Sequence, residues 1–292
     1  MSSAEVPRPA RDLALLGVGI AIAVVAILYG PTVATLWPIE SVLLVTMLIY
    51  AAVFAPMVAA AFGLGMVSGV KTFAPGQPLG KWMALGLAAG TGGLAIAVGY
   101  TWLVGALVPG TTGALIGSGL VAGFALILFQ VACEEVFFRG WVQPLLARLV
   151  PPLVAVGIGA VLFAGFHVLG GARSLVTLAN LLLGGIWFGL LAWRSGGIVA
   201  PVAAHFGWNA SEQLFFGLDP NPGLGDFGAL SDWDLTGPAI WGGSEEGLNS
   251  SIAMTFVMLA LIAPLLLSPK QSERRATAPA LRAPHPPGRA PA

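Results

Sequence analysis

Long runs of apolar residues, separated by short polar stretches, dominate the pattern of this chain. A helix of about 20 apolar residues is long enough to cross the hydrocarbon core of a bilayer. Runs that meet or approach this length lie at residues 13–37, 41–70, 84–108, 112–150, 153–169, 175–193, 198–216 and 251–267. The pattern therefore predicts an all-α protein, a polytopic transmembrane helical bundle of about eight spanning helices.

The stretches between these runs divide the chain into four parts. Residues 1–12 are polar and predict a cytoplasmic N-terminal segment, and residues 13–108 hold the first three transmembrane helices. Residues 112–267 hold the remaining helices and all the candidate chemistry discussed below. Residues 268–292 are rich in proline, alanine and arginine, and they predict a disordered tail.

The composition fits a membrane protein and excludes other classes. Hydrophobic residues make up 57% of the 292 residues and charged residues only 9%, which is typical of a membrane-embedded chain. The chain has no basic patch suited to nucleic acid, and its single cysteine, Cys133, excludes an internal disulfide. The abundance of alanine, glycine, proline and arginine is typical of a GC-rich bacterium, so we expect a bacterial plasma membrane.

The basic residues lie mostly on one side of the predicted bundle. With eight spans, both termini and the linkers 71–82 and 194–197 share a side, which holds every basic residue except Arg139 and Arg173. The acidic loop 217–249 faces the other way. By the positive-inside rule, both termini are predicted to be cytoplasmic.

The apolar run 112–150 contains three charged residues, Glu134, Glu135 and Arg139. A carboxylate in hydrocarbon is costly unless it is paired or lines a wet cavity. On a helix, Glu135 and Arg139 share a face, whereas Glu134 lies about 100° away from Glu135. We therefore expect Glu135 to be the paired, structural carboxylate and Glu134 to be able to accept a proton from water. The alternative is that all three form an ion-pair cluster that locks helices together.

Two histidines and an asparagine on later runs are the other polar candidates. His167 and Glu134 lie at equal distances from the turn at residues 151–152, roughly 22 to 24 Å, so we expect them at one depth. His205 and Asn209 are four residues apart and form a pair of neutral donors that could stabilise an oxyanion. Hydrogen bonding between helices is the alternative role for this pair. Counting along the helix places His205 shallower than Glu134 and His167, a mismatch that the sequence leaves open.

Three of these residues are also chemically able to bind a metal ion. Glu134, His167 and His205 are suitable zinc ligands, although an HExxH motif is absent. The residues by themselves therefore leave a divalent metal such as zinc as one possibility and a site with no cofactor as the other.

Three motifs, in order on three apolar runs, carry a family resemblance. Glu134-Glu135-x3-Arg139, Phe163-x3-His167 and His205-x3-Asn209 resemble the CAAX protease and bacteriocin-processing family of intramembrane proteases, which includes the type II CAAX prenyl endopeptidases. The resemblance implies a peptidase of the glutamate or metallo type. Of the two we favour the type with no cofactor, because asparagine is a good oxyanion donor and a poor zinc ligand, and a divalent metal such as zinc stays the alternative. The resemblance also implies the following roles: water activation by Glu134 and His167, an oxyanion hole of His205 and Asn209, and support from Glu135, Arg139 and Phe163.

On this resemblance, residues 112–267 are an intramembrane protease domain that cleaves a membrane protein or peptide within the lipid bilayer. Its bacterial members are linked to bacteriocin maturation and self-immunity, and the sequence does not choose among substrates. One alternative is a non-catalytic membrane immunity or partner protein that uses the polar cluster structurally. A second is a small-solute or proton carrier, which favours an inverted repeat of interrupted helices, and no such repeat is evident.

Overall fold

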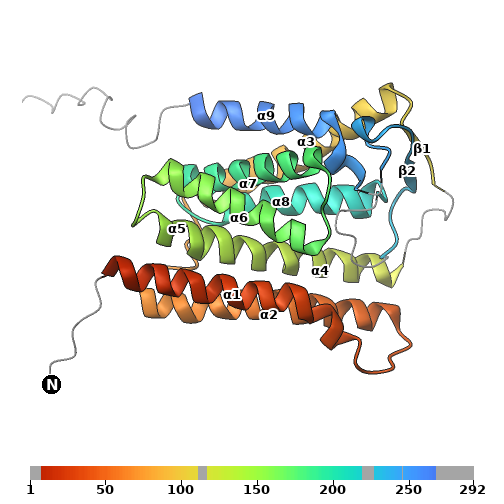
Figure 1. The fold of residues 1–292 in the computed structure, drawn as a ribbon. Helices are drawn as coiled ribbons and strands as arrows, with labels where there is room; N and C mark the ends of the chain where they lie inside the picture. The colour runs from red at the N-terminus through yellow and green to blue at the C-terminus, as the bar shows by residue number, and fades with distance from the viewer. Residues whose placement is uncertain (1–7, 111–116, 219–226, 245, 268–292) are drawn as a thin grey trace, which may run out of the picture.

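The computed structural model describes residues 8–110, 117–218, 227–244 and 246–267 of the chain. They form a bundle of helices that run side by side in alternating directions (Figure 1). The helices are α1 (Arg8–Ala34), α2 (Val42–Ser68), α3 (Leu79–Leu103), α4 (Ser118–Glu135), α5 (Gln143–Leu146), α6 (Pro152–Gly170), α7 (Leu175–Ser195), α8 (Val199–Ala210) and α9 (Ile252–Leu267). The predicted disordered tail, 268–292, lies outside the described residues.

The described helices confirm the predicted all-α bundle. Six helical segments in this part of the chain are long and apolar enough to cross a membrane, and α9 is a shorter apolar helix. Helix α8 continues into a π-helical segment, Ser211–Phe215, which lengthens it. The chain is therefore an integral membrane protein.

The helices are arranged around a central group formed by α4, α6, α7 and α8 (Figure 1). Helices α1 and α2 pair on one side of this group, where α2 packs on α4 and α1 touches α6. Helices α3 and α9 lie on the opposite side, where α3 packs on α8 and α9 on α7. The predicted site residues all lie on α4, α6 and α8 or on the π-helical continuation of α4, so the site is central.

The run 112–150 is not one regular helix. Helix α4 ends at Glu135 and continues as a π-helical segment, Val136–Val142, before the short helix α5. Pro144 gives a local reason, because proline has no amide to bond the carbonyl of Gly140 and disfavours α-helix there. In the wider π-helical turn, the amide of Gln143 instead reaches back to the carbonyl of Phe138.

Close helix packing holds α8 in place. A Cβ atom on Gly86 of α3 would lie 2.4 Å from the carbonyl oxygen of Ala200, and one on Gly90 would lie 2.0 Å from that of Ala204. Only glycine permits this approach, as is usual where small residues bring membrane helices together. The position of α8 relative to α3 is therefore fixed by the sequence of both helices.

The turn between α7 and α8 is buried, which removes the predicted depth mismatch of His205. The linker after α2 folds over this turn: the amide of Ile198 donates to the carbonyl of Ala74 (2.8 Å), and the amide of Gln77 donates to that of Ser195 (3.1 Å). Ser195 and Ile198 are 5% and 3% exposed. Helix α8 thus begins under the linker. The sequence-based depth of His205 was too shallow because it assumed that the turn before α8 lies at the surface.

At the other end of the bundle, the acidic loop folds back onto the helices. Strand β1 (Leu107–Pro109) pairs antiparallel with β2 (Trp233–Leu235) of that loop (Figure 1). Helix α3 therefore ends at Leu103, before the predicted end at residue 108, because the following residues form the strand. Trp241 of the loop also packs against Tyr100 of α3, with ring centroids 5.9 Å apart.

Candidate active site

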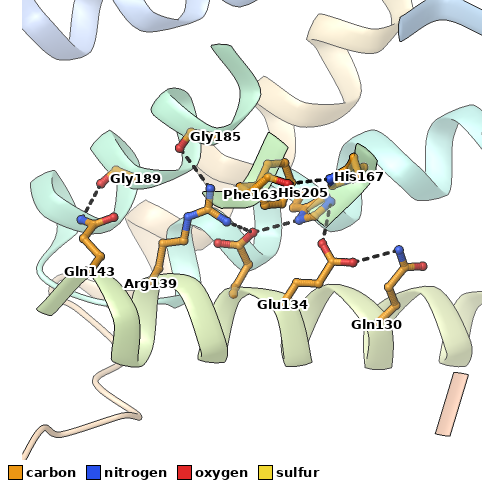
Figure 2. A network of polar contacts seen from close by, with 10 residues as sticks. Gln130, Glu134, Arg139, Gln143, Phe163, His167, Gly185, Gly189 and His205 are labelled. Carbon is orange, nitrogen blue, oxygen red and sulfur yellow. Dashed lines mark hydrogen bonds and ion pairs between the residues drawn. The ribbon is translucent and has the colours of Figure 1, made fainter. Parts of the chain in front are cut away.

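Polar side chains from four helical elements meet in the centre of the bundle. Figure 2 shows Glu134 and Arg139, with Phe163 and His167 of α6 and His205 of α8 around them. Glu134, Glu135, Arg139 and His205 are all less than a tenth exposed. The sequence-predicted site residues are thus brought together from positions up to 75 residues apart.

Glu135 is held by two partners. Its Oε1 accepts a hydrogen bond from Arg139 Nη1 at 2.9 Å and lies 2.9 Å from His205 Nδ1. Arg139 also donates to the carbonyl of Gly185 on α7 (3.0 Å), and its guanidinium stacks over the Phe163 ring, 4.8 Å from the centroid. Glu135 and Arg139 therefore tie the π-helical segment to α6, α7 and α8.

Glu134 points into a different environment. Its Oε1 accepts a hydrogen bond from Gln130 Nε2 at 3.1 Å, and its Oε2 lies 3.9 Å from His205 Nε2 (Figure 2). Among the residues described, none makes a hydrogen bond to that Oε2 atom, although it is buried. A buried carboxylate oxygen with unused acceptor capacity is well suited to hold a water molecule.

The two histidines are oriented by oxygen acceptors. His167 Nδ1 lies 2.9 Å from the carbonyl oxygen of Phe163, one turn earlier, and a carbonyl only accepts, so Nδ1 donates and Nε2 is left for other partners. His205 stacks on Phe188, with centroids 4.5 Å apart and rings 20° from parallel. Its Nδ1 donates to the Glu135 carboxylate, which leaves Nε2 facing Glu134.

Two cavities reach this cluster from opposite sides. The polar cavity is lined by Asn180, His205, Asn209 and Asn249, among others. The apolar cavity is lined by Glu134 together with Ile27, Val53, Met57 and Phe166, among others. Gln130 and His167 line both cavities. A chain that occupied both would pass directly over the glutamate and histidine cluster.

Asn209 lies where its spacing predicts, in the wall of the polar cavity with His205 and His167. The metal alternative fits this geometry poorly. Within the described ranges, no group of three His, Cys, Asp or Glu side chains is placed to hold a metal ion.

Several features of the site were not predicted from the sequence. Gln130 lies four residues before Glu134 in an otherwise apolar stretch, so its polarity was the signal that could have revealed it. Asn180 and Glu212 also line the polar cavity. The two π-helical segments, Val136–Val142 and Ser211–Phe215, follow Glu135 and Asn209 closely, and such turns often accompany functional sites.

The fold and this site define an integral membrane protein with a buried glutamate and histidine cluster between two cavities. Residues 116–211 match the family described as type II CAAX prenyl endopeptidase, Rce1-like, which confirms the predicted resemblance for this segment. The matched segment contains every predicted site residue, and at the level of the family it supports a membrane-embedded protease. The search of the curated proteins found no match to the chain.

Proposed function

We propose that this protein is an intramembrane endopeptidase that hydrolyses a peptide bond of a membrane-associated protein or peptide. The single observation that carries the proposal is the buried Oε2 of Glu134, which has unused acceptor capacity in a residue that lines the apolar cavity next to Gln130 and His167, the residues shared by both cavities. A water molecule bound there by Glu134 and His167 would be close to a peptide that extends between the cavities. The family match over residues 116–211 supports the same class of reaction.

The proposed reaction uses only groups of this site. Water oxygen attacks the peptide carbonyl carbon while the water proton passes to the Glu134 carboxylate, and His167 orients the water through Nε2. The carbonyl oxygen becomes an oxyanion, which His205 and Asn209 stabilise by hydrogen bonds. When the intermediate collapses, the carbon–nitrogen bond breaks and the leaving nitrogen takes the proton from Glu134.

The contacts of His205 support its role as an oxyanion donor. Its Nδ1 lies 2.9 Å from Glu135 Oε1, and a carboxylate only accepts, so Nδ1 donates there. Its Nε2 lies 3.9 Å from Glu134 Oε2, which is beyond hydrogen-bond distance. In this proposal Nε2 donates one hydrogen bond to the oxyanion and Asn209 donates the other.

We further propose that the protein lies in a bacterial plasma membrane with both termini in the cytoplasm, and that the mechanism needs no metal. The substrate is a partner in the bilayer rather than a soluble protein, because the apolar cavity is walled by α1, α2, α4 and α6. Side chains such as Ile27 and Val53 would receive an apolar part of that substrate.

Cleavage of a panel of membrane-tethered peptides by the purified protein in detergent tests this proposal. The comparison is between the wild-type protein, Glu134→Gln and His167→Ala, each with and without a chelator. We expect wild-type cleavage to persist in chelator and to fall by at least about 10²-fold in both variants. Thermal unfolding shows that each variant is folded. Full activity of a folded Glu134→Gln variant would exclude the mechanism, and loss of wild-type activity in chelator would require a metal.

A further inference from the structure

One carboxyl group in the polar cavity has no part in the proposed reaction. Glu212 belongs to the π-helical segment Ser211–Phe215, three residues after Asn209, and lines the cavity together with Asn209 and His205. It is only 4% exposed. Residues three apart on a helix have Cβ atoms about 5 to 6 Å apart. Glu212 therefore lies within about two residues of extended peptide from the expected oxyanion hole.

Glu212 lacks a lysine or arginine partner in the described part of this cavity. Among the described residues that line the cavity, Glu212 is the only one with a carboxyl group, and none is a lysine or an arginine. The two histidines of the lining bind other groups, because His205 bonds Glu135 and His167 bonds the carbonyl of Phe163. No described residue makes a hydrogen bond or an ion pair with the Glu212 side chain. Arg139, the buried arginine of the site, is engaged by Glu135 and the carbonyl of Gly185.

A carboxylate that is buried without a cation is costly, and a cation that enters beside it gains a large attraction. The structure offers space for such a cation, because Glu212 faces a cavity rather than packed side chains. Neighbouring Gln213 and Asn249 add neutral polar groups to the same wall. The site is therefore complementary to a positively charged group that arrives with the substrate.

We propose that Glu212 is a specificity residue that binds a lysine or arginine side chain of the substrate within about two residues of the cleaved bond. This inference rests on the proposed peptidase function, since it assigns a substrate class to the same site. The preferred substrate then has an apolar part in the apolar cavity and a basic residue in the polar cavity. The basic residue supplies the positive charge that the cavity lacks.

Matched peptides test this inference. Two membrane-tethered peptides differ only in carrying lysine or methionine, residues of similar length, at the positions that flank the cleaved bond. We expect the wild-type protein to show a kcat/KM at least about tenfold higher for the lysine peptide. Glu212→Gln should bring the ratio close to one, and Glu212→Asp, which keeps the charge, should retain a preference. Met254→Leu, which alters the lining of the same cavity without changing its charge or polar groups, should keep the wild-type ratio.

Binding measured with uncleavable versions of the two peptides, in which a neutral ketomethylene group replaces the amide, separates this inference from the proposed function. Selective binding of the lysine peptide by wild type, lost in Glu212→Gln, supports the inference even if neither parent peptide is cleaved, in which case the peptidase proposal fails. Cleavage of both parent peptides at equal rates, with equal binding, overturns the inference and leaves the peptidase proposal standing. A lysine preference that survives in Glu212→Gln also overturns it.

Discussion

Glu134 and Glu135 are adjacent in sequence, yet their side chains have different partners. Glu135 bonds Arg139 and His205 in a region from which solvent is excluded, whereas Glu134 bonds the neutral Gln130 and borders the apolar cavity. Removing one partner of a buried ion pair leaves an uncompensated charge, which is more costly than the loss of one neutral contact. The two residues should therefore respond differently to the same substitution.

We expect Glu135→Gln to lower the free energy of unfolding by about 3 to 5 kcal/mol, because Arg139 loses its counter-charge. Glu134→Gln keeps a side chain of equal size beside Gln130 and should cost less than about 1.5 kcal/mol. Unfolding of both variants in detergent measures the difference. If the two variants are destabilised equally, the cluster is structural throughout, as the non-catalytic alternative requires.

The chemistry of the site could be predicted residue by residue, but its supporting contacts could not. A charged or polar residue in an apolar run stands out in the sequence, because its transfer into lipid is unfavourable unless it has a function or a partner. Glu134, His167 and His205 could be predicted for this reason. The buried Asp12 was not found, since it lies next to a polar N-terminal stretch. It forms an ion pair with Arg148 (3.6 Å), a partner 136 positions away that no local pattern indicates.

At the scale of elements, the depth of α8 depends on a contact between distant segments. Helix counting assumes that a turn lies at the membrane surface, and the turn before α8 lies under the linker that carries Ala74 and Gln77. The same linker touches the π-helical segment, because a Cβ atom on Gly140 would lie 2.2 Å from the carbonyl oxygen of Thr72. One loop thus positions both Arg139 and His205.

This contact makes Gly140 sensitive to the smallest substitution. Gly140→Ala forces the linker away from the π-helical segment, and we expect a loss of about 1 to 3 kcal/mol in unfolding free energy. Gly157→Ala on α6 is the matched control, since a Cβ atom there meets nothing within 4 Å. Alanine is the better helix former, so that control should be neutral or slightly stabilising. Thermal unfolding measures both variants. An equal change in stability for Gly140→Ala and Gly157→Ala would show that the contact between Gly140 and the linker is not important.

The acidic loop is fastened to α7 by one carboxylate. Glu246 Oε1 accepts hydrogen bonds from the backbone amides of Arg173 and Ser174 at the start of α7, both at 2.9 Å. Partial burial by itself would raise the pKa of Glu246, but the Thr177 hydroxyl, these amides and the Arg173 charge outweigh it and lower the pKa. The ionised form therefore stabilises the closed loop.

Because the folded-state pKa is lowered, this stabilisation is complete above the ordinary carboxyl value, near 4.5, and is lost as the pH falls through the lower folded value. We expect the amides of residues 239–244 and 246–251 to lose protection from hydrogen exchange in that acidic range, after correction for intrinsic exchange rates. Glu246→Gln should show the weaker protection already at neutral pH. A wild-type pH profile in this variant would show that another group fastens the loop.

At the scale of the whole molecule, the site is built by more of the chain than the family match covers. Helices α1 and α2 precede residues 116–211, yet Ile27, Val53 and Met57 line the apolar cavity beside Glu134. The polar cavity is closed by Asn249 and Met258, which follow the matched segment. The segment that matches the family thus lies at the centre of the bundle, and helices before and after it complete the walls of the two cavities.

The orientation of the bundle in the membrane decides which compartment the acidic loop faces. The wall of the polar cavity that contains Asn249 faces the same compartment as the loop. The basic residues predict that Lys81 lies on the cytoplasmic side and that Ile240 lies on the opposite side. Lys81→Cys and Ile240→Cys test this prediction, because both positions are exposed and the native Cys133 is only 3% exposed. A membrane-impermeant maleimide should label Ile240→Cys in intact spheroplasts and Lys81→Cys only after permeabilisation. The reverse pattern would place both termini outside, so that a peptide in the cytoplasm would meet the loop side of the polar cavity.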